Sequence, residues 1–465
     1  MLFRRLRQFS TKILLLAASQ LIQGQVFASD LQHFYELSLL NDPAIRAAEA
    51  SYNASKANVG ISRSALLPQI NLQGQYSEFD SDSVNNDSIA QFAGGSITDT
   101  ASDSTTYFAT LNQPIFNLPR YHDYRQSKEN RYSAAAQFGL EKQNLAIRVA
   151  EAYFNTLRAI DNLDSVMSEE GAFKTQKEQT KKRFDVGLIP ITDVHETQAA
   201  YDEVVVRLLE ARGQLGIRFD AMSELTGQFH AEITPLSSEF PIIDPSPLSV
   251  DEWLASTLEF NATVEASEYQ KNAAEQNYKA RRSAHLPTVD VSANIGNINT
   301  DGTRNQELFD NQNNSNSIML SLRVPLFTGG LVSNQRKLAY QQLLQAKESY
   351  LASKRRAVQM TRSLHLSVVT KVAQITALQK SVNSSQSALN ATQAGHKAGT
   401  RDLVDLLIAE RTFYQARRNL LNARYDYIAN LLSLKRSAGV LNSNDMEQLN
   451  VWLDSDSVIS RGRYF

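Results

Sequence analysis

The stretch HKAGTRDLVDLLIAERTFY runs from His396 to Tyr414 and places a glycine, an arginine and two aspartates between two segments with helical spacing. A related stretch, FDVGLIPITDVHETQAAY, runs from Phe184 to Tyr201, 212 residues earlier. A glycine after a helical pattern, followed by an acidic residue before the next one, is typical of a helix end and a new helix start. Each stretch therefore predicts a turn that joins two helices.

The segments beside these turns are unusually long. All eleven prolines fall outside 120–189 and 326–465, so roughly 70 residues precede the first turn without a break, about 100 Å of helix. Apolar residues recur every three or four positions, which predicts helix packing. The two stripes are Val149, Tyr153, Leu157, Ile160, Leu163 and Met167, and Leu364, Val368, Val372, Ile375, Leu378 and Val382. Because the remaining faces are polar, long coiled coils in water are expected.

The chain also contains two copies of one unit. Ala65-Leu66-Leu67-Pro68 recurs as Ala284-His285-Leu286-Pro287, and Gly187, Asp193 and Gly227 recur as Gly399, Asp405 and Gly439. Landmarks in one order at nearly one offset indicate an internal repeat. The predicted division is a signal peptide at 1–28, a first repeat at 29–234, a proline-rich linker at 235–248, a second repeat at 249–440 and an irregular tail at 441–465.

Each repeat is expected to contain two strands and one helical hairpin. The strands are predicted at 69–79, 105–116, 288–298 and 316–327, and the hairpins at 119–227 and 330–438. Residues 288–295 alternate cleanly between apolar and polar side chains, as in strands of an outer-membrane barrel or of a half-buried soluble sheet. Four strands cannot close a barrel, so copies of the chain would have to share one. The acidic segments 77–105 and 296–316 are expected to be solvated loops, an interpretation favoured over a calcium site.

The first residues and the composition restrict the compartment and the partners. A basic start, a short apolar run and Val26-Phe27-Ala28 predict an exported chain cut before Ser29. Without residues 1–28 the formal charge changes from −2 to −6, which argues against nucleic acid as a partner. The chain has no cysteine, so disulfides and a lipid-modified cysteine are excluded. No metal, cofactor or catalytic motif is found, and an enzyme is not expected.

The sequence resembles the outer membrane factor family of efflux and secretion channels. The motifs that carry the resemblance are LLPQINLQGQY, RFDVGLIPITDV, HLPTVDVSANIG, SLRVPLFTGGLV and AGTRDLVDLL, in family order, over about residues 31–449. The resemblance implies an α+β membrane protein, a homotrimer whose four strands per chain form a 12-stranded barrel in the outer-membrane lipid. Its helices would continue as a periplasmic coiled-coil barrel that docks onto an adaptor and an inner-membrane pump of the RND type or an ABC exporter.

The resemblance also implies a gate at the two turns. Thr192, Asp193, His396 and Arg401 match the network that closes the family's periplasmic mouth, and Asp405 matches a carboxylate ring at the constriction. Two departures are present. Ile408 stands where a second aspartate is expected, which predicts weaker cation selectivity, and His396 replaces a tyrosine. A protonated His396 is expected to pair with Asp193 and to tighten the closed state.

Other interpretations stay open from the residues alone. Asp193 with Glu196 is compatible with a capping box, and Asp402 or Asp405 with a favourable charge at a helix start. A soluble periplasmic scaffold or adaptor would explain the helices, with the sheet buried against protein. A diffusion porin open at rest would explain the strands and leave the long helices unexplained.

Overall fold

The computed structural model describes residues 30–85, 96–304, 307–454 and 456–465. The predicted signal peptide at 1–28 lies outside these described residues. The described chain divides into two compact units. One contains the chain up to Arg46, with Glu141–Asn261 and Val358–Phe465. The other contains Ala47–Leu140 and Ala262–Ala357. No helix within the described ranges combines the length and hydropathy needed to cross a membrane.

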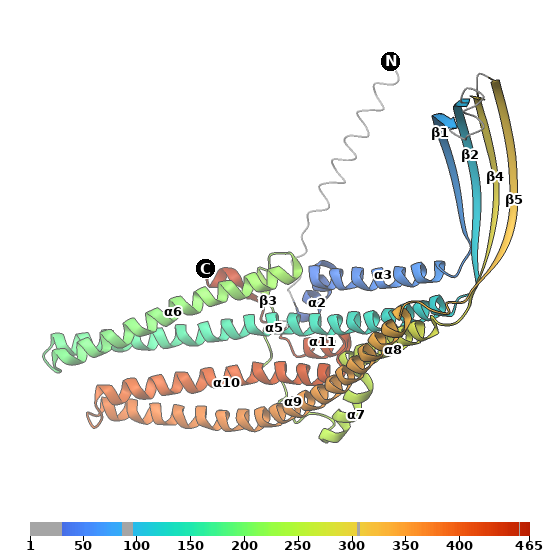
Figure 1. Ribbon diagram of the computed structural model, residues 1–465. Helices are drawn as coiled ribbons and strands as arrows, with labels where there is room; N and C mark the ends of the chain where they lie inside the picture. The colour runs from blue at the N-terminus through green and yellow to red at the C-terminus, as the bar shows by residue number, and fades with distance from the viewer. Residues whose placement is uncertain (1–29, 86–95, 305–306, 455) are drawn as a thin grey trace, which may run out of the picture. The chain divides into compact units, whose positions relative to one another are not determined.

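The unit containing Ala47–Leu140 holds a four-stranded sheet (Figure 1). Its strands are β1 (Gln69–Asn85), β2 (Ser96–Phe116), β4 (Thr288–Arg304) and β5 (Glu307–Arg323), all antiparallel in the order β1-β2-β4-β5. Two shorter helices, α3 (Pro43–Ser64) and α8 (Ala262–Ser283), precede β1 and β4. Tyr52 of α3 stacks on Phe138, and Tyr269 of α8 lies against Tyr132.

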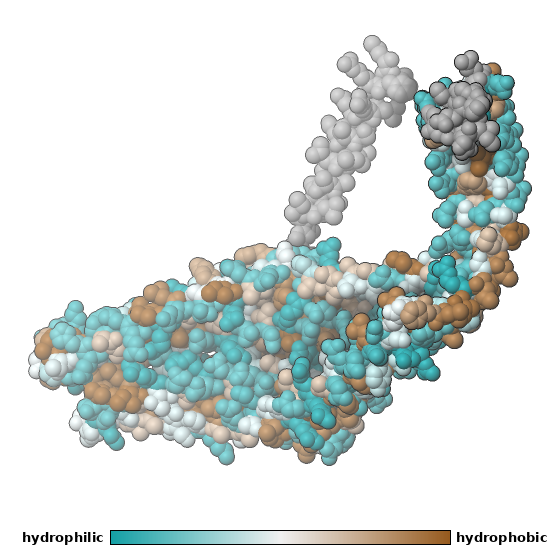
Figure 2. Space-filling view, viewed as in Figure 1, coloured by the Kyte–Doolittle hydropathy of each residue, from teal (hydrophilic) through white to brown (hydrophobic). Residues whose placement is uncertain are grey.

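The register of the sheet sorts its side chains by face. Ile70, Leu111, Ala293 and Ile318 are successive partners across all four strands, so one face carries an apolar row. The neighbouring partners on the opposite face are polar: Asn71, Thr110, Asn294 and Ser317. Side chains alternate along a strand, so this register keeps the two faces distinct. In Figure 2 the apolar residues gather toward the lower end of the sheet, and the coloured residues of its upper part are mostly hydrophilic.

The strands are longer than the alternation predicts. The sequence predicts loops at 77–105 and 296–316, but β1 continues to Asn85, β2 begins at Ser96, and β4 pairs with β5 as far as Arg304 and Glu307. The parts of these predicted loops at 86–95 and 305–306 lie outside the described residues. The sequence-based expectation is wrong there because it relied on apolar side chains. Strand pairing satisfies backbone N–H and C=O groups whatever the side chains are, so Ser, Asn and Asp continue the ladder where both faces are solvated.

The unit containing Glu141–Asn261 is built around two helical hairpins. The helices are α5 (Leu118–Asp185) with α6 (Ile191–Thr226) and α9 (Leu331–Lys397) with α10 (Leu403–Ser437), and this unit contains α5 from Glu141 and α9 from Val358. It also contains α2 (Leu31–Asn41), α7 (Val250–Phe260) and α11 (Ser443–Asn450). These lengths follow from the missing prolines, since nothing else in the sequence interrupts the helical hydrogen bonds.

The predicted apolar stripe of α5 forms much of the core. Val149, Tyr153, Leu157, Ile160 and Leu163 are fully or almost fully buried. The Tyr153 hydroxyl donates a 2.7 Å hydrogen bond to the carbonyl of Thr234, and its ring meets Phe34 of α2. Met167, the last member of the predicted stripe, is instead 40% exposed. In the α9 stripe Val368 and Ile375 are buried, and the other four residues are half-buried in the single chain.

The tail after Leu441 was expected to be irregular, and this expectation is wrong. Asn442 and Asp445 form a capping box that starts α11. Strand β6 (Ile459–Ser460) pairs with β3 (Glu232–Ile233), and a short 3-10 helix covers Arg461–Arg463. The buried Tyr464 then donates to Asp164 of α5 at 3.1 Å. Sequence periodicity missed this order because elements of two to eight residues carry too little pattern.

Candidate functional site

The candidate site begins at the two turns that join the long helices. In the first turn Gly187 has φ +73°, and its N–H donates to the carbonyl of Phe184. In the second turn Gly399 has φ +77°, and its N–H donates to the carbonyl of His396. The next amide in each turn also donates a hydrogen bond: Leu188 to the carbonyl of Arg183, and Thr400 to the carbonyl of Gly395. These two carbonyls occupy equivalent positions, 212 residues apart in the sequence. A left-handed glycine with these two bonds closes a helix end. The two turns therefore have the same local geometry.

The two turns differ in how the following helix starts. Pro190 precedes α6 without any side-chain cap, and Asp193 lies within the first helical turn. The capping-box interpretation of Asp193 and Glu196 is therefore wrong. In the second turn Asp402 is the N-cap of α10, and its carboxylate accepts from the Asp405 amide at 2.8 Å. The helix-capping interpretation of Asp402 is confirmed.

The second turn gathers three of the predicted gate residues. Arg401 Nη1 lies 3.2 Å from Asp405 Oδ2, an exposed pair one helical turn apart. His396 Nδ1 lies 3.3 Å from the carbonyl of Arg401. A Cβ on Gly395 would lie 2.9 Å from Arg401 Cγ, so a glycine at this position leaves room for the arginine stem over the end of α9. His396, Arg401 and Asp405 thus form one polar group.

His396 also links the two hairpins. Its Nε2 lies 3.4 Å from Arg183 Nη1 near the end of α5. A carbonyl only accepts and a guanidinium only donates, so both contacts are satisfied by a neutral imidazole with the proton on Nδ1. The predicted partner for a protonated His396 was Asp193, but the described contacts place a cation there.

Thr192 and Asp193 lie apart from this group. The Thr192 hydroxyl is 3.4 Å from the Asp193 carboxylate, and the hydroxyl of Thr197 donates to the Asp193 backbone carbonyl. Among the described residues of the single chain, no ion pair joins Asp193 to Arg401 or His396. The structure thus brings together the gate residues of the second turn and leaves those of the first turn by themselves.

A set of charged residues that the sequence analysis missed joins the two hairpins further along the helices. We call it the charge clamp, and it consists of Glu169 on α5, Arg207 and Glu203 on α6, and Arg411 and Arg418 on α10. Glu169 is fully buried and binds Arg207 at 2.7 Å and Arg418 at 2.6 Å. Glu203 is half exposed and binds Arg207 at 2.6 Å and Arg411 at 2.8 Å. The alternating charges connect three helices.

An apolar cluster accompanies the clamp. It consists of Val166, Phe173, Ala200, Val204, Leu403 and Leu407, from α5, α6 and α10. Leu403 and Leu407 follow the second turn directly, so the start of α10 packs on the first hairpin. The position of Asp405 on α10 is therefore coupled to this packing.

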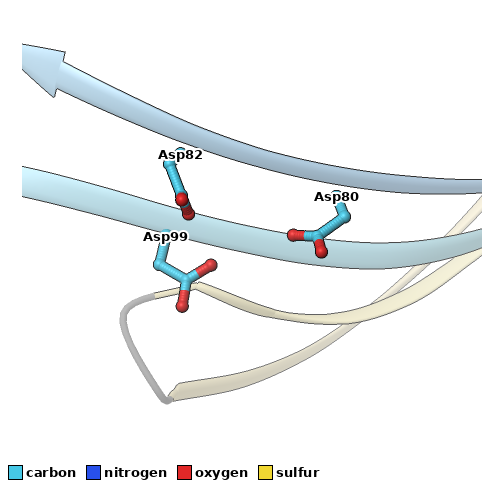
Figure 3. A group of neighbouring side chains, drawn as sticks. All are labelled: Asp80, Asp82 and Asp99. Atoms are coloured by element: carbon cyan, nitrogen blue, oxygen red, sulfur yellow. The ribbon is translucent and has the colours of Figure 1, made fainter.

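The acidic strand ends contain a separate group of side chains. Asp80 and Asp82 on β1 and Asp99 on β2 each present a carboxylate oxygen within 4.8 Å of the others (Figure 3). All three are exposed, and Asp82 and Asp99 are direct partners across the strands. Exposed carboxylates often gather without an ion, and we assign no metal site to them.

Comparison with known proteins covers most of the chain. The sequence profile of the family described as "Outer membrane efflux protein" matches residues 34–228 and 253–440. The outer membrane protein TolC of Vibrio cholerae is 33% identical over 439 residues, which cover 94% of this chain and 97% of that protein. The proteases secretion protein PrtF of Dickeya chrysanthemi is 27% identical over 464 residues, which cover 97% of this chain and 96% of that protein.

Solved structures show the same fold. The outer membrane protein VceC of Vibrio cholerae superposes with a TM-score of 0.74 at 21% identity, covering 88% of this chain and 96% of that one. At this level of identity the likeness concerns the fold alone.

Proposed function

The chain belongs to the outer membrane efflux protein family, as a member of the TolC type, and we propose that it acts as a passive exit duct in the outer membrane. It is a channel protein and not an enzyme. The relatives include outer membrane and secretion proteins. The proposed duct serves drug efflux, type I protein secretion or both.

The observation that carries the proposal is the sheet. Its apolar row crosses all four strands and is largely uncovered in the single chain, with Ile70 and Ile318 73% and 85% exposed. The outermost strands β1 and β5 each leave one edge free for a further strand. A membrane barrel needs about eight strands or more, so copies of the chain have to complete it. Three copies give the proposed 12-stranded barrel with the apolar row facing lipid.

The helical hairpins supply the proposed periplasmic part. Leu338, Leu351 and Leu366 on α9 are 60%, 43% and 66% exposed, and such apolar side chains are available to helices of neighbouring copies. In the proposed closed state, Arg401 of one copy meets Thr192 and Asp193 of the next, and the Asp405 carboxylates form a ring that attracts cations. Docking of a periplasmic adaptor and an inner-membrane RND-type pump or ABC exporter opens the mouth.

Fractionation and mass measurement test the assembly. We expect the exported protein to sediment with outer membranes, to resist detergent-free extraction, and to have the mass of three chains in detergent. Recovery of a monomer from the aqueous periplasmic fraction would contradict the proposal and favour a soluble scaffold.

A further inference from the structure

Glu410 is a buried acidic residue that belongs neither to the proposed gate nor to the charge clamp. It lies on α10 and is 5% exposed. Its Oε2 has no hydrogen-bond partner within the described part of the chain. Buried polar atoms are nearly always hydrogen-bonded, and a buried carboxylate without a cation is costly. An acid in this position therefore needs a physical explanation.

Among the described residues, no ion pair joins Glu410 to a cation. Burial raises the pKa of Glu410, the like charge of the fully buried Glu169 on α5 adds to this, and the side-chain amide of Gln393 on α9 opposes it. Other titratable or charged groups in this part of the hairpins are Arg207 and Glu203 on α6 and Arg411, Tyr414, Arg417 and Arg418 on α10.

Three of these arginines are engaged in the charge clamp. Arg207 and Arg418 each bind one oxygen of Glu169, and Arg411 binds Glu203 on the outside of the clamp. The Tyr414 hydroxyl donates to the carbonyl of Ser168 at 3.2 Å. Ionised Glu410 would thus place a second negative charge beside Glu169 with only an amide to support it.

We propose that Glu410 is a proton-binding site that controls how tightly the α9–α10 hairpin packs against α5–α6. The protonated carboxyl fits the packed arrangement, because it is neutral beside Glu169. Loss of the proton favours an arrangement in which the carboxylate reaches water and the hairpins separate. The site acts within one subunit, so its packing effect stands apart from the proposed channel function. If that function holds, the site adds a pH dependence to opening.

The direction of the pH effect follows from the buried acid. The pKa of Glu410 is raised to about 7: burial is the largest cause, the amide of Gln393 opposes it, and the negative charge of Glu169 adds to it. Between the ordinary pKa of a glutamate and about 7, the packed form holds a proton that an open, hydrated form releases. Packing is therefore strongest in acid and weakens as the pH rises through this window. One proton changes the ratio of packed to separated forms by up to about tenfold per pH unit.

Distances between the hairpins test the proposal directly. Because the chain has no cysteine, spin labels can be placed at Ala199→Cys on α6 and Ala391→Cys on α9, both exposed. Labelled protein is mixed with excess unlabelled protein so that pairs within one subunit dominate. We expect the distance distribution to shift to longer values between pH 6 and 8. Glu410→Gln, which stays neutral, should hold the acid distribution at both pH values.

The exposed Glu196 provides the matched control, and infrared spectroscopy a second readout. Glu196→Gln should keep the wild-type pH response. The wild-type protein should show a protonated-carboxyl band at pH 6 that is lost by pH 8 and is absent from Glu410→Gln. An unchanged pH response in Glu410→Gln would assign the effect to another group and overturn the proposal. A wild-type distance distribution independent of pH, or no protonated-carboxyl band at pH 6, would also overturn it.

Discussion

Replacing Gly439 by alanine is expected to destabilise strongly the unit that contains the hairpins. Gly439 has φ +76°, and a Cβ there would overlap the backbone carbonyl of Phe260 and lie 2.8 Å from the amide nitrogen of Asn261. The left-handed backbone and the overlap together should cost roughly 3 kcal/mol or more. Thermal unfolding followed by circular dichroism in detergent measures the loss.

Gly227 is the matched control because it occupies the equivalent position, 212 residues earlier. It caps the end of α6, and Gly439 follows the end of α10. Its φ is +68°, but a Cβ there meets nothing within 4 Å. Gly227→Ala should therefore lower the free energy of unfolding only by the cost of a left-handed backbone at alanine, about 1 kcal/mol. Equal losses for the two variants would show that contact with Phe260 contributes nothing.

Replacing Glu169 by glutamine is the second change with a large expected effect. The fully buried carboxylate binds Arg207 and Arg418 with one oxygen each, and the Arg418 side chain is only 12% exposed. Removing one partner from a buried ion pair leaves the other charge uncompensated and costs about 3–5 kcal/mol. Chemical denaturation of Glu169→Gln should show this loss.

The variant Glu203→Gln tests whether the stability loss expected for Glu169→Gln comes from burial of the carboxylate and not from pairing alone. Glu203 also binds two arginines at comparable distances, but its side chain is 51% exposed. Its replacement should cost less than about 1 kcal/mol, as for other exposed pairs. Glu169→Gln should in addition lower the pKa of Glu410, because the negative charge of Glu169 raises it. Similar stability losses for the two variants would contradict the importance assigned to burial.

Much of the fold could be predicted from the sequence because long elements repeat their pattern many times. The proline-free segments gave helices of the expected length, and glycines at 187 and 399 marked the turns. Strand ends and the tail could not be predicted, because there the backbone pairs without an apolar pattern. Tyr464 illustrates this: its burial depends on Asp164 of α5, 300 residues away.

The candidate site was less predictable, since its contacts join distant helices. Glu169 meets Arg207 and Arg418 across 38 and 249 residues, which no local spacing reveals. A signal was nevertheless present. Glu169 follows Val166 by three residues, and Glu410 follows Leu407 by three, so both acids interrupt apolar stripes. An acid at such a position indicates a buried charge that needs a partner or a proton.

Planar-bilayer conductance of the purified protein tests the central claim, a gated channel, most directly. Wild-type protein is compared with Arg401→Ala, Asp405→Ala and, as control, Arg212→Ala, which removes an exposed arginine of α6. An exposed arginine–carboxylate pair contributes up to about 1 kcal/mol, so each lost pair should shift the open-to-closed ratio by up to about fivefold.

The account predicts low wild-type conductance that rises in Arg401→Ala, weaker cation selectivity in Asp405→Ala, and no change in Arg212→Ala. Absence of channels from protein with verified membrane insertion would contradict the channel itself. A large wild-type conductance that none of the variants alters would contradict the gate at the helical turns.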